Sequence, residues 1–488
     1  MNHCPRLPQA SAVLHKLGVK VNALTADSRK VRAGVAFAAY PGSARDGREF
    51  VPQAISAGAT AVLWEREHYQ WDSAWALPNV AVDNLRGRVG EIAACVYGDP
   101  SAQMNLVGVT GTNGKTSVSH WIAQSLTLLG TPCAVVGTLG NGFVNQLAPS
   151  ANTTPDAIEL QAALAGYLKA GAAACAMEVS SHGLHQGRVN GCQFKVAVLT
   201  NLTRDHLDYH GSMEAYAAAK STLFVWPQLE TAVLNLDDDF GRTLMQATSA
   251  SKVLGYGAAR GDVRAESIHA GRDGVRMTLN TPWGRGEIHA NLFGRFNADN
   301  LMAALCALLA SGVDLDSACR ALGRVSPPAG RMQTLGGEGL PLVVVDYAHT
   351  PDALTKVLAT LHRVAEQGDG GRVLCVFGCG GNRDKGKRPL MGAAASAGAD
   401  RVFVTSDNPR LEDPEAIIDD ILEGVLASKT SIEPDRARAI FEAIGAARPQ
   451  DIVLIAGKGH EDYQDAGGEK RPFSDFDTAR KALEAWNG

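Results

Sequence analysis

Short apolar runs alternate with longer segments of helical periodicity along most of the chain. Runs at 105–109, 133–137, 174–180 and 194–201 have the length of buried strands. The segments between them place apolar residues three and four positions apart, which is typical of helices packed on a sheet. Strands that alternate with helices in this order predict parallel sheets covered by helices, so the pattern predicts an α/β fold.

The same alternation occurs on both sides of this central region. Predicted N-terminal elements are strands at 35–39 and 59–64 with a helix at 50–58, and an apolar hairpin is predicted within 275–293. The C-terminal strands are predicted at 342–346, 373–377, 401–405 and 452–456. A chain of 488 residues has room for about three domains. We expect them at residues 1–98, 99–330 and 331–488.

A glycine-rich loop, residues 108–117, lies between the strand at 105–109 and a helical segment at 118–129. Strand, glycine loop and helix in this order predict a phosphate site, because backbone N–H groups and the helix N-terminus face the ligand. Lys115 would reach the β- and γ-phosphates, and the Thr116 hydroxyl would bind Mg²⁺. Val109 stands where the general pattern has its first glycine, so an ordinary glycine-rich turn is the alternative.

Polar side chains follow the next two central strands at their carboxyl ends. Glu178 ends one strand, and His206 follows the other. Open parallel sheets bind ligands at this edge, so the two side chains predict a divalent-cation site beside a triphosphate. A helix is predicted at 212–224, and Lys220 on its small apolar face, taken alone, is interpreted as a surface lysine. The polar clusters at 27–29 and 41–49, also taken alone, are interpreted as solvated turns.

The C-terminal strands also end in polar residues, at 346–349, 378–383, 407–410 and 457–461. Several polar strand ends in one sheet predict a lined cleft. The alternative for the charged run at 383–388 is a solvated loop.

Net charge and cysteine content bear on the protein's binding partners and on the redox state of its compartment. The net charge is −5, from 46 basic and 51 acidic residues, which gives no general attraction to nucleic acid or membranes. The nine cysteines are odd in number and scattered, which favours a reducing compartment. Cys375 and Cys379 are interpreted as core and loop residues. We expect no signal peptide, no membrane span and a cytoplasmic monomer.

A series of segments resembles the Mur ligases, the ATP-dependent amino-acid ligases of peptidoglycan precursor synthesis. The segments are, in family order, 108–116, 152–156, 178–184, 201–210, 329–332, 346–352 and 457–461. The resemblance implies three domains, a central P-loop ATPase domain with Rossmann-like flanking domains. It also implies that an acyl phosphate forms from ATP on UDP-N-acetylmuramoyl-L-alanyl-D-glutamate, with Mg²⁺. The amine of meso-2,6-diaminopimelate would then displace phosphate. No nucleophilic side chain is needed.

The resemblance also assigns site residues. The ATP-binding residues would be Gly111, Thr112, Asn113, Gly114, Lys115, Thr116, Ser117, Asn297, Arg331, Asp346 and His349. The UDP-muramoyl-dipeptide would contact Ala26, Ser28, Ser43, Ala44, Arg45, Asn152, Thr153, Thr154, Ser180, Gln186 and Arg188. Diaminopimelate would contact Arg383, Asp407, Asn408, Pro409, Arg410, Gly457 and Glu461. The metal site would use Thr116, Glu178, His206 and Lys220 as a carbamate, and the catalytic residues would be Lys115, Lys220 and His206.

Two alternatives remain at this point. One is a folylpolyglutamate synthetase-like ligase, which shares the loop and adds glutamate to folate. The segment at 407–410 and the N-terminal domain argue against it. The other is a nucleotide-binding switch that performs no ligation.

Overall fold

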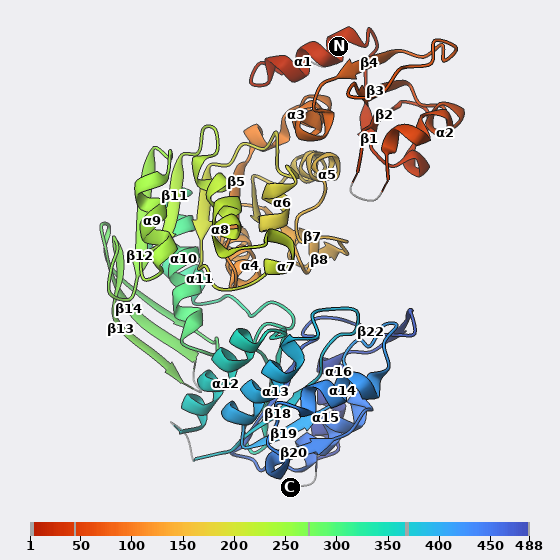
Figure 1. Cartoon of the computed structure of the whole chain (residues 1–488). Coiled ribbons are helices and arrows are strands. Elements are labelled where there is room, and N and C mark those ends of the chain that lie inside the picture. The colour runs from red at the N-terminus through yellow and green to blue at the C-terminus, as the bar shows by residue number, and fades with distance from the viewer. Residues whose placement is uncertain (1–3, 43–44, 272–273, 367–369, 487–488) are drawn as a thin grey trace. The chain divides into compact units, whose positions relative to one another are not determined.

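The computed structural model describes residues 4–42, 45–271, 274–366 and 370–486. The chain forms two compact units. Unit 1 contains residues up to 266 together with 279–286 and 299–322, and unit 2 contains 267–278, 287–298 and the residues from 323 onward. Helices alternate with strands throughout (Figure 1), so the predicted α/β class is confirmed.

The N-terminal part of unit 1 contains a four-stranded parallel sheet in sequence order. Its strands are β1 (Ala23–Thr25), β2 (Val35–Ala39), β3 (Ala61–Glu65) and β4 (Asn79–Val82). Its helices are α1 (Pro8–Lys16), α2 (Val51–Ser56) and α3 (Leu85–Val96). The two middle strands are buried along their whole length, which explains why they form continuous apolar runs in the sequence.

Two loops of this region differ from the prediction of solvated turns. Each contains a short 3₁₀ helix, Ser28–Lys30 and Gly47–Phe50, whose first N–H groups are capped by an aspartate. Ser28 is buried, with its hydroxyl 2.9 Å from Gln53 Oε1. Arg48 is buried as well and donates to the carbonyl oxygen of Glu67. These loops are therefore built into the fold, which their polar composition alone did not indicate.

The largest sheet has eleven strands in the order β15-β14-β13-β12-β11-β10-β5-β9-β6-β7-β8. Its parallel centre consists of β5 (Asn105–Thr110), β9 (Ala174–Glu178), β6 (Cys133–Gly137) and β10 (Val196–Leu199). The remaining strands are β7 (Gly140–Phe143), β8 (Gln146–Ala148), β11 (Thr231–Asn235), β12 (Lys252–Gly257), β13 (Val263–Gly271), β14 (Gly274–Thr281) and β15 (Gly284–Ala290). Since β10, β5 and β9 are parallel neighbours, the segments that follow them meet at one edge.

Helix boundaries in this region depend on caps. The helices are α4 (Lys115–Leu128), α5 (Ala157–Lys169), α6 (Ser181–His185), α7 (Leu207–His210), α8 (Met213–Ser221), α9 (Asp239–Ala247), α10 (Phe296–Ala310) and α11 (Leu315–Leu322). Asp156 caps α5 by accepting from the N–H groups of Ile158 and Glu159. Ser212 caps α8 in the same way through the N–H of Ala215.

Unit 2 contains a six-stranded sheet in the order β16-β17-β21-β18-β19-β20. The strands are β16 (Gln333–Gly336), β17 (Leu342–Asp346), β18 (Val373–Phe377), β19 (Arg401–Val404), β20 (Thr430–Ile432) and β21 (Ile452–Ala456). The helices are α12 (Pro351–Glu366), α13 (Lys387–Gly398), α14 (Pro414–Leu422), α15 (Arg436–Gly445) and α16 (Asp475–Glu484). A separate hairpin pairs β22 (Tyr463–Ala466) with β23 (Glu469–Pro472).

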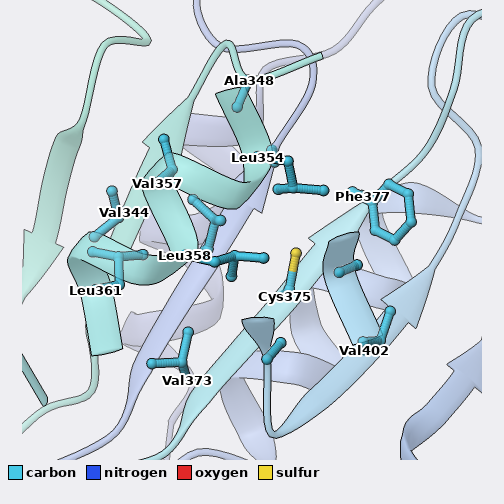
Figure 2. Close-up of a cluster of buried hydrophobic side chains, with 14 of the residues drawn as sticks. Val344, Ala348, Leu354, Val357, Leu358, Leu361, Val373, Cys375, Phe377 and Val402 are labelled. Carbon is cyan, nitrogen blue, oxygen red and sulfur yellow. The ribbon is translucent and has the colours of Figure 1, made fainter. Parts of the chain in front are cut away.

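The apolar core of unit 2 lies between this sheet and its helices. Leu354, Leu358 and Leu361 of α12 pack with Cys375 and Phe377 of β18 (Figure 2). Cys375 is thus a core residue, as predicted, and all nine cysteines are buried and free. Over the described residues, no helix combines the length and the apolar character that crossing a membrane requires.

Candidate active site

The glycine-rich loop follows β5 and leads into α4. Gly111 and Gly114 have φ angles of +146° and +86°, which favour glycine. A Cβ atom at either position would collide with a neighbouring side chain, Thr200 or Asn300 respectively. The N-cap position of α4 is Gly114, which has no side chain to cap the first turn. The loop therefore has the backbone conformation and the helix N-terminus that a phosphate group requires.

Two lysine ammonium groups meet at one carbonyl of this loop. Lys115 Nζ donates to the carbonyl oxygens of Gly111 and Thr112, both at 2.9 Å, and Lys220 Nζ donates to that of Gly111 at 2.8 Å. Lys220 is almost completely buried, 4.6 Å from the centre of the Tyr216 ring. The interpretation of Lys220 as a surface lysine is therefore wrong. Burial, and then the charge of Lys115, lower the pKa of Lys220 well below 10.5.

Glu178 lies at the other side of the loop, at the end of β9. Its carboxylate accepts from the Thr116 hydroxyl at 3.0 Å and from the Thr138 backbone N–H at 2.8 Å. The Thr138 hydroxyl is also 3.0 Å from the hydroxyl of Thr153. Thr138 was not predicted as a site residue, because it lies in a loop after β6 that matches none of the Mur ligase segments.

His206 follows β10 in a left-handed conformation, with φ of +52°. Its ring centre is 4.8 Å from that of His182. Burial lowers the pKa of His206, the charge of Asp205 opposes this shift, and the charges of Lys115 and Lys220 add to it. Within the described residues, no contact joins His206 to Glu178.

The oxygen ligands near the loop suit Mg²⁺. In the part of the chain that the structure describes, no group of three or more His, Cys, Asp or Glu side chains is arranged to hold a metal. Mg²⁺ needs no such group, because it typically binds one or two carboxylates together with substrate phosphates and water. Glu178 and the Thr116 hydroxyl are a carboxylate and an oxygen donor of this kind, 3.0 Å apart.

Residues assigned to the muramoyl-dipeptide partly come together beside Glu178. The Thr154 hydroxyl is 3.1 Å from that of Ser180, and Arg188 donates to the Thr154 carbonyl oxygen at 2.9 Å. Arg188 also donates to Gln186 Oε1. Asn152, Ala26 and Arg45 are exposed and make none of these contacts. Ser43 and Ala44 lie outside the described residues.

In unit 2, a second polar cluster follows β17. The Asp346 carboxylate accepts from the backbone N–H groups of Met332 at 2.9 Å and Ala348 at 2.8 Å, and burial raises its pKa. The guanidinium of Arg331 lies 4.7 Å from the centre of the Tyr347 ring, which is 4.7 Å from the His349 ring. Asn297, at the start of α10, is buried and donates to the Phe293 carbonyl oxygen at 2.7 Å.

A third cluster joins the segments that follow β19 and β21. Asn408 Nδ2 donates to Glu461 Oε2 at 2.7 Å, and Lys458 Nζ donates to the same oxygen at 2.9 Å. Asp407 lies against Gly457, where a Cβ atom would be 2.6 Å from Asp407 Oδ2. Pro409, which follows Asn408 in the sequence, is also buried. Lys458 was not among the predicted site residues, although it lies inside the matching segment 457–461.

Arg410 completes this cluster. It has φ of +54°, its N–H donates to the Asp465 carbonyl oxygen at 2.9 Å, and its Nη1 donates to the Gly381 carbonyl oxygen at 2.6 Å. A Cβ atom at Gly380 would be 2.9 Å from Arg410 Nη1 and 3.9 Å from Arg383 Cγ, so both arginines flank this glycine. Arg383 itself is exposed. The segments that follow β18, β19 and β21 therefore lie close together, and the cleft predicted among them stays a prediction.

The fold and the loop define a P-loop α/β protein, and comparison with known proteins gives its family. The chain matches the Mur ligase family catalytic domain over residues 20–97, the Mur ligase middle domain over 109–308 and the Mur ligase glutamate ligase domain over 330–459. The chain belongs to the Mur ligase family.

Individual relatives cover nearly the whole chain. A protein of Chromobacterium violaceum, named UDP-N-acetylmuramoyl-L-alanyl-D-glutamate–2,6-diaminopimelate ligase, is 53% identical over 97% of each chain. A solved structure with the same name is 40% identical, with a TM-score of 0.71 over 95% of each chain. Folylpolyglutamate synthase of Mycobacterium tuberculosis has a TM-score of 0.62 at 21% identity over 76% of this chain, which is a likeness of fold alone.

Proposed function

We propose that this protein is an ATP-dependent ligase that adds meso-2,6-diaminopimelate to UDP-N-acetylmuramoyl-L-alanyl-D-glutamate in peptidoglycan precursor synthesis. The observation that supports it most directly is the arrangement around residues 111–116. Two lysines meet at the Gly111 carbonyl, and the Thr116 hydroxyl contacts Glu178. This arrangement brings two ammonium groups and two oxygen donors to the glycine-rich loop, where they would face phosphate and Mg²⁺. The relatives that match along nearly the full chain carry the name of this ligase.

The reaction has two displacement steps. The D-glutamate side-chain carboxylate attacks the γ-phosphorus of ATP, ADP leaves, and an acyl phosphate forms. The amine of diaminopimelate then attacks the acyl carbon, loses a proton, and phosphate leaves. Both steps develop negative charge on phosphate oxygens, so Lys115 and the N–H groups of the loop stabilise them electrostatically. Bound Mg²⁺ would supply further positive charge at the phosphates, held through Thr116 and Glu178, with His206 nearby.

Lys220 has a role that its burial and pKa support. A lysine with a lowered pKa has more of the neutral amine, which is the form that reacts with CO₂. The amine nitrogen bonds to the carbon of CO₂ and releases one proton, which leaves a carbamate anion on Lys220. We assign this anion to the metal site, where it would replace the positive charge of the ammonium by a negative one.

Substrates and domains are assigned as follows. The three domains are residues 1–98 for the UDP part, 99–330 for ATP and 331–488 for the amino acid. Within unit 2, Asp346, Arg331, His349 and Asn297 would contact ATP. The Asp407–Arg410 segment, with Arg383, Gly457 and Glu461, would bind diaminopimelate. The protein would act as a monomer in the cytoplasm, with no nucleic acid partner.

One assay tests this function. The purified protein is supplied with ATP, Mg²⁺, UDP-muramoyl-dipeptide and a panel of diamino acids, and phosphate release and the peptide product are measured. We expect both to depend on meso-diaminopimelate. Phosphate release without any amino-acid dependence would favour the nucleotide switch, and ligation of glutamate to folate would favour the folylpolyglutamate alternative.

A further inference from the structure

Lys458 is a fully buried cation in unit 2. Its Nζ donates to Asn408 Oδ1 at 3.1 Å and to Glu461 Oε2 at 2.9 Å. The Lys458 side chain has 0% exposure, whereas that of Glu461 has 19%. Among the described residues, the covered Lys458 ammonium donates to these two side chains alone. Any effect of Lys458 on a ligand must therefore pass through the two side chains that it holds.

These contacts fix the orientation of the Asn408 amide. Asn408 Oδ1 accepts from Lys458 Nζ and from the backbone N–H of Asp465 at 2.9 Å, and Nδ2 donates to Glu461 Oε2 at 2.7 Å. Turning the amide over would place its NH₂ group against an ammonium and an N–H, and its oxygen against a carboxylate. Such unmade hydrogen bonds are costly in a buried site, so only one orientation is stable.

The same contacts leave one acceptor on Glu461. Its Oε2 is held by Asn408 and Lys458, and within the described residues its Oε1 accepts no hydrogen bond. Lys458 also compensates the negative charge of Glu461, which lies mostly buried beside it. The cluster thus presents an amide N–H donor and a carboxylate acceptor in fixed positions.

We propose that Lys458 is a positioning residue that sets the selectivity of this cluster for a substrate end bearing both a carboxylate and an ammonium. The Asn408 N–H serves the carboxylate and Glu461 Oε1 serves the ammonium. Lys458 holds both in place without contacting the substrate. The inference rests on the proposed function and deepens it, because it names the residue that orients two groups of the amino-acid site.

The test compares Lys458→Met and Lys458→Gln with Lys470→Met as the matched control. The ammonium groups of Lys458 and Lys470 lie 5.5 Å and 4.0 Å from the ring centre of the same tyrosine, Tyr463, but Lys470 is exposed. The measurements are kcat and KM for meso-diaminopimelate and L-lysine, KM for ATP and for UDP-muramoyl-dipeptide, and the melting temperature. ADP formed in a single turnover without amino acid reports the first chemical step.

We expect both Lys458 variants to fold and to form ADP as the wild type does. Their kcat/KM for meso-diaminopimelate should fall by about 10- to 100-fold, mainly through KM, because a hydrogen-bonded charge is lost from the cluster. The ratio of kcat/KM for meso-diaminopimelate to kcat/KM for L-lysine should decrease. KM for ATP and KM for UDP-muramoyl-dipeptide should stay within about twofold of the wild-type values. Lys470→Met should match the wild type.

Other results would overturn the inference. A folded variant with wild-type preference for diaminopimelate would show that Lys458 does not orient the site. An equal loss of kcat/KM for meso-diaminopimelate, ATP and UDP-muramoyl-dipeptide would make Lys458 a structural residue only. Failure of both variants to fold would lead to the same conclusion. If the wild type itself ligates no diaminopimelate in this assay, the proposed function fails first and this inference falls with it.

Discussion

The carbonyl oxygen of Gly111 accepts hydrogen bonds from both Lys115 and Lys220, at 2.9 and 2.8 Å. The lysines lie on different helices, α4 and α8, and the bent glycine loop brings them together. Two like charges this close to each other disfavour full protonation, which adds to the effect of burial on Lys220. The loop therefore holds one lysine suited to phosphate and one with an increased neutral fraction.

We predict that Lys115→Met lowers ligation by about 10²- to 10³-fold while the fold is retained. The Lys115 ammonium is the loop cation that would neutralise the transferring phosphoryl group, a contribution commonly of about 3–4 kcal/mol, or a factor of about 10²–10³ in kcat. Ligation is measured by phosphate release, and folding by the melting temperature. Lys169→Met, at an exposed end of α5, is the control. Near-normal turnover of folded Lys115→Met would refute the ATP site.

We predict that Lys220→Ala is severely impaired and that added short carboxylates, such as formate or acetate, partly restore ligation. The substitution would remove the proposed carbamate, and a small carboxylate in the space of the missing side chain would supply an anion near the proposed metal site. Activity is measured across a range of carboxylate concentrations. Electron density at Lys220 of the wild type tests the carbamate directly. A fully active alanine variant would rule out any catalytic role for this lysine.

The histidines beside the loop give a prediction on pH. Burial, followed by the charges of His206 and His210, lowers the pKa of His182 from 6.5 to about 4. Between these values the unfolded chain binds a proton that the folded protein does not. The contribution of neutral His182 to the stability of the folded protein is therefore complete above pH 6.5, and it is lost progressively as the pH falls toward 4. We expect the melting temperature of the wild type to drop more between pH 7 and pH 5 than that of His182→Gln.

The control for this comparison is His15→Gln, a substitution on the exposed side of α1. Its melting temperature should follow the wild type at both pH values. An identical pH dependence in the wild type and His182→Gln would show that the folded protein protonates His182 as readily as the unfolded chain does.

Local sequence determines much of this fold, because the spacing of apolar residues and the positions of glycines influence the backbone within a few residues. The strands at 35–39, 133–137, 342–346 and 373–377 have the predicted bounds. The glycine loop also adopts the expected conformation, since positive φ at Gly111 and Gly114 is a property of those residues themselves.

Burial of single polar residues did not follow from the same patterns. Lys220 is covered because the loop after β5 folds over α8, a contact between segments about a hundred residues apart. Arg48 and Lys458 are likewise buried, and each has one partner that only the tertiary structure brings near, Glu67 and Asn408 respectively. The family resemblance identified Lys220 by position, but neither it nor the residue pattern identified Thr138, whose contact with Glu178 depends on the turn after β6.

The last prediction concerns the choice between meso-diaminopimelate and L-lysine, which differ by one distal carboxylate. The planar guanidinium of Arg410 is suited to bind a carboxylate by donating two parallel hydrogen bonds to its oxygens. Its left-handed backbone is held by the hairpin β22–β23, through the bonds of its N–H to Asp465 and of its carbonyl oxygen to Gly467. The hairpin and the Gly381 carbonyl oxygen thus hold Arg410 in place, two residues after Asn408.

We predict that the wild type prefers diaminopimelate to lysine by at least about 30-fold in kcat/KM, because lysine leaves the guanidinium without its anion at a cost of about 2 kcal/mol. Arg410→Ala should lose most of this preference by losing activity toward diaminopimelate, and Arg410→Lys should stay well below the wild type, since an ammonium lacks the planar fork. Arg438→Ala, at an exposed arginine of α15, is the control. Equal use of both amino acids by the wild type, or an unchanged ratio in Arg410→Ala, would show that another residue selects the substrate.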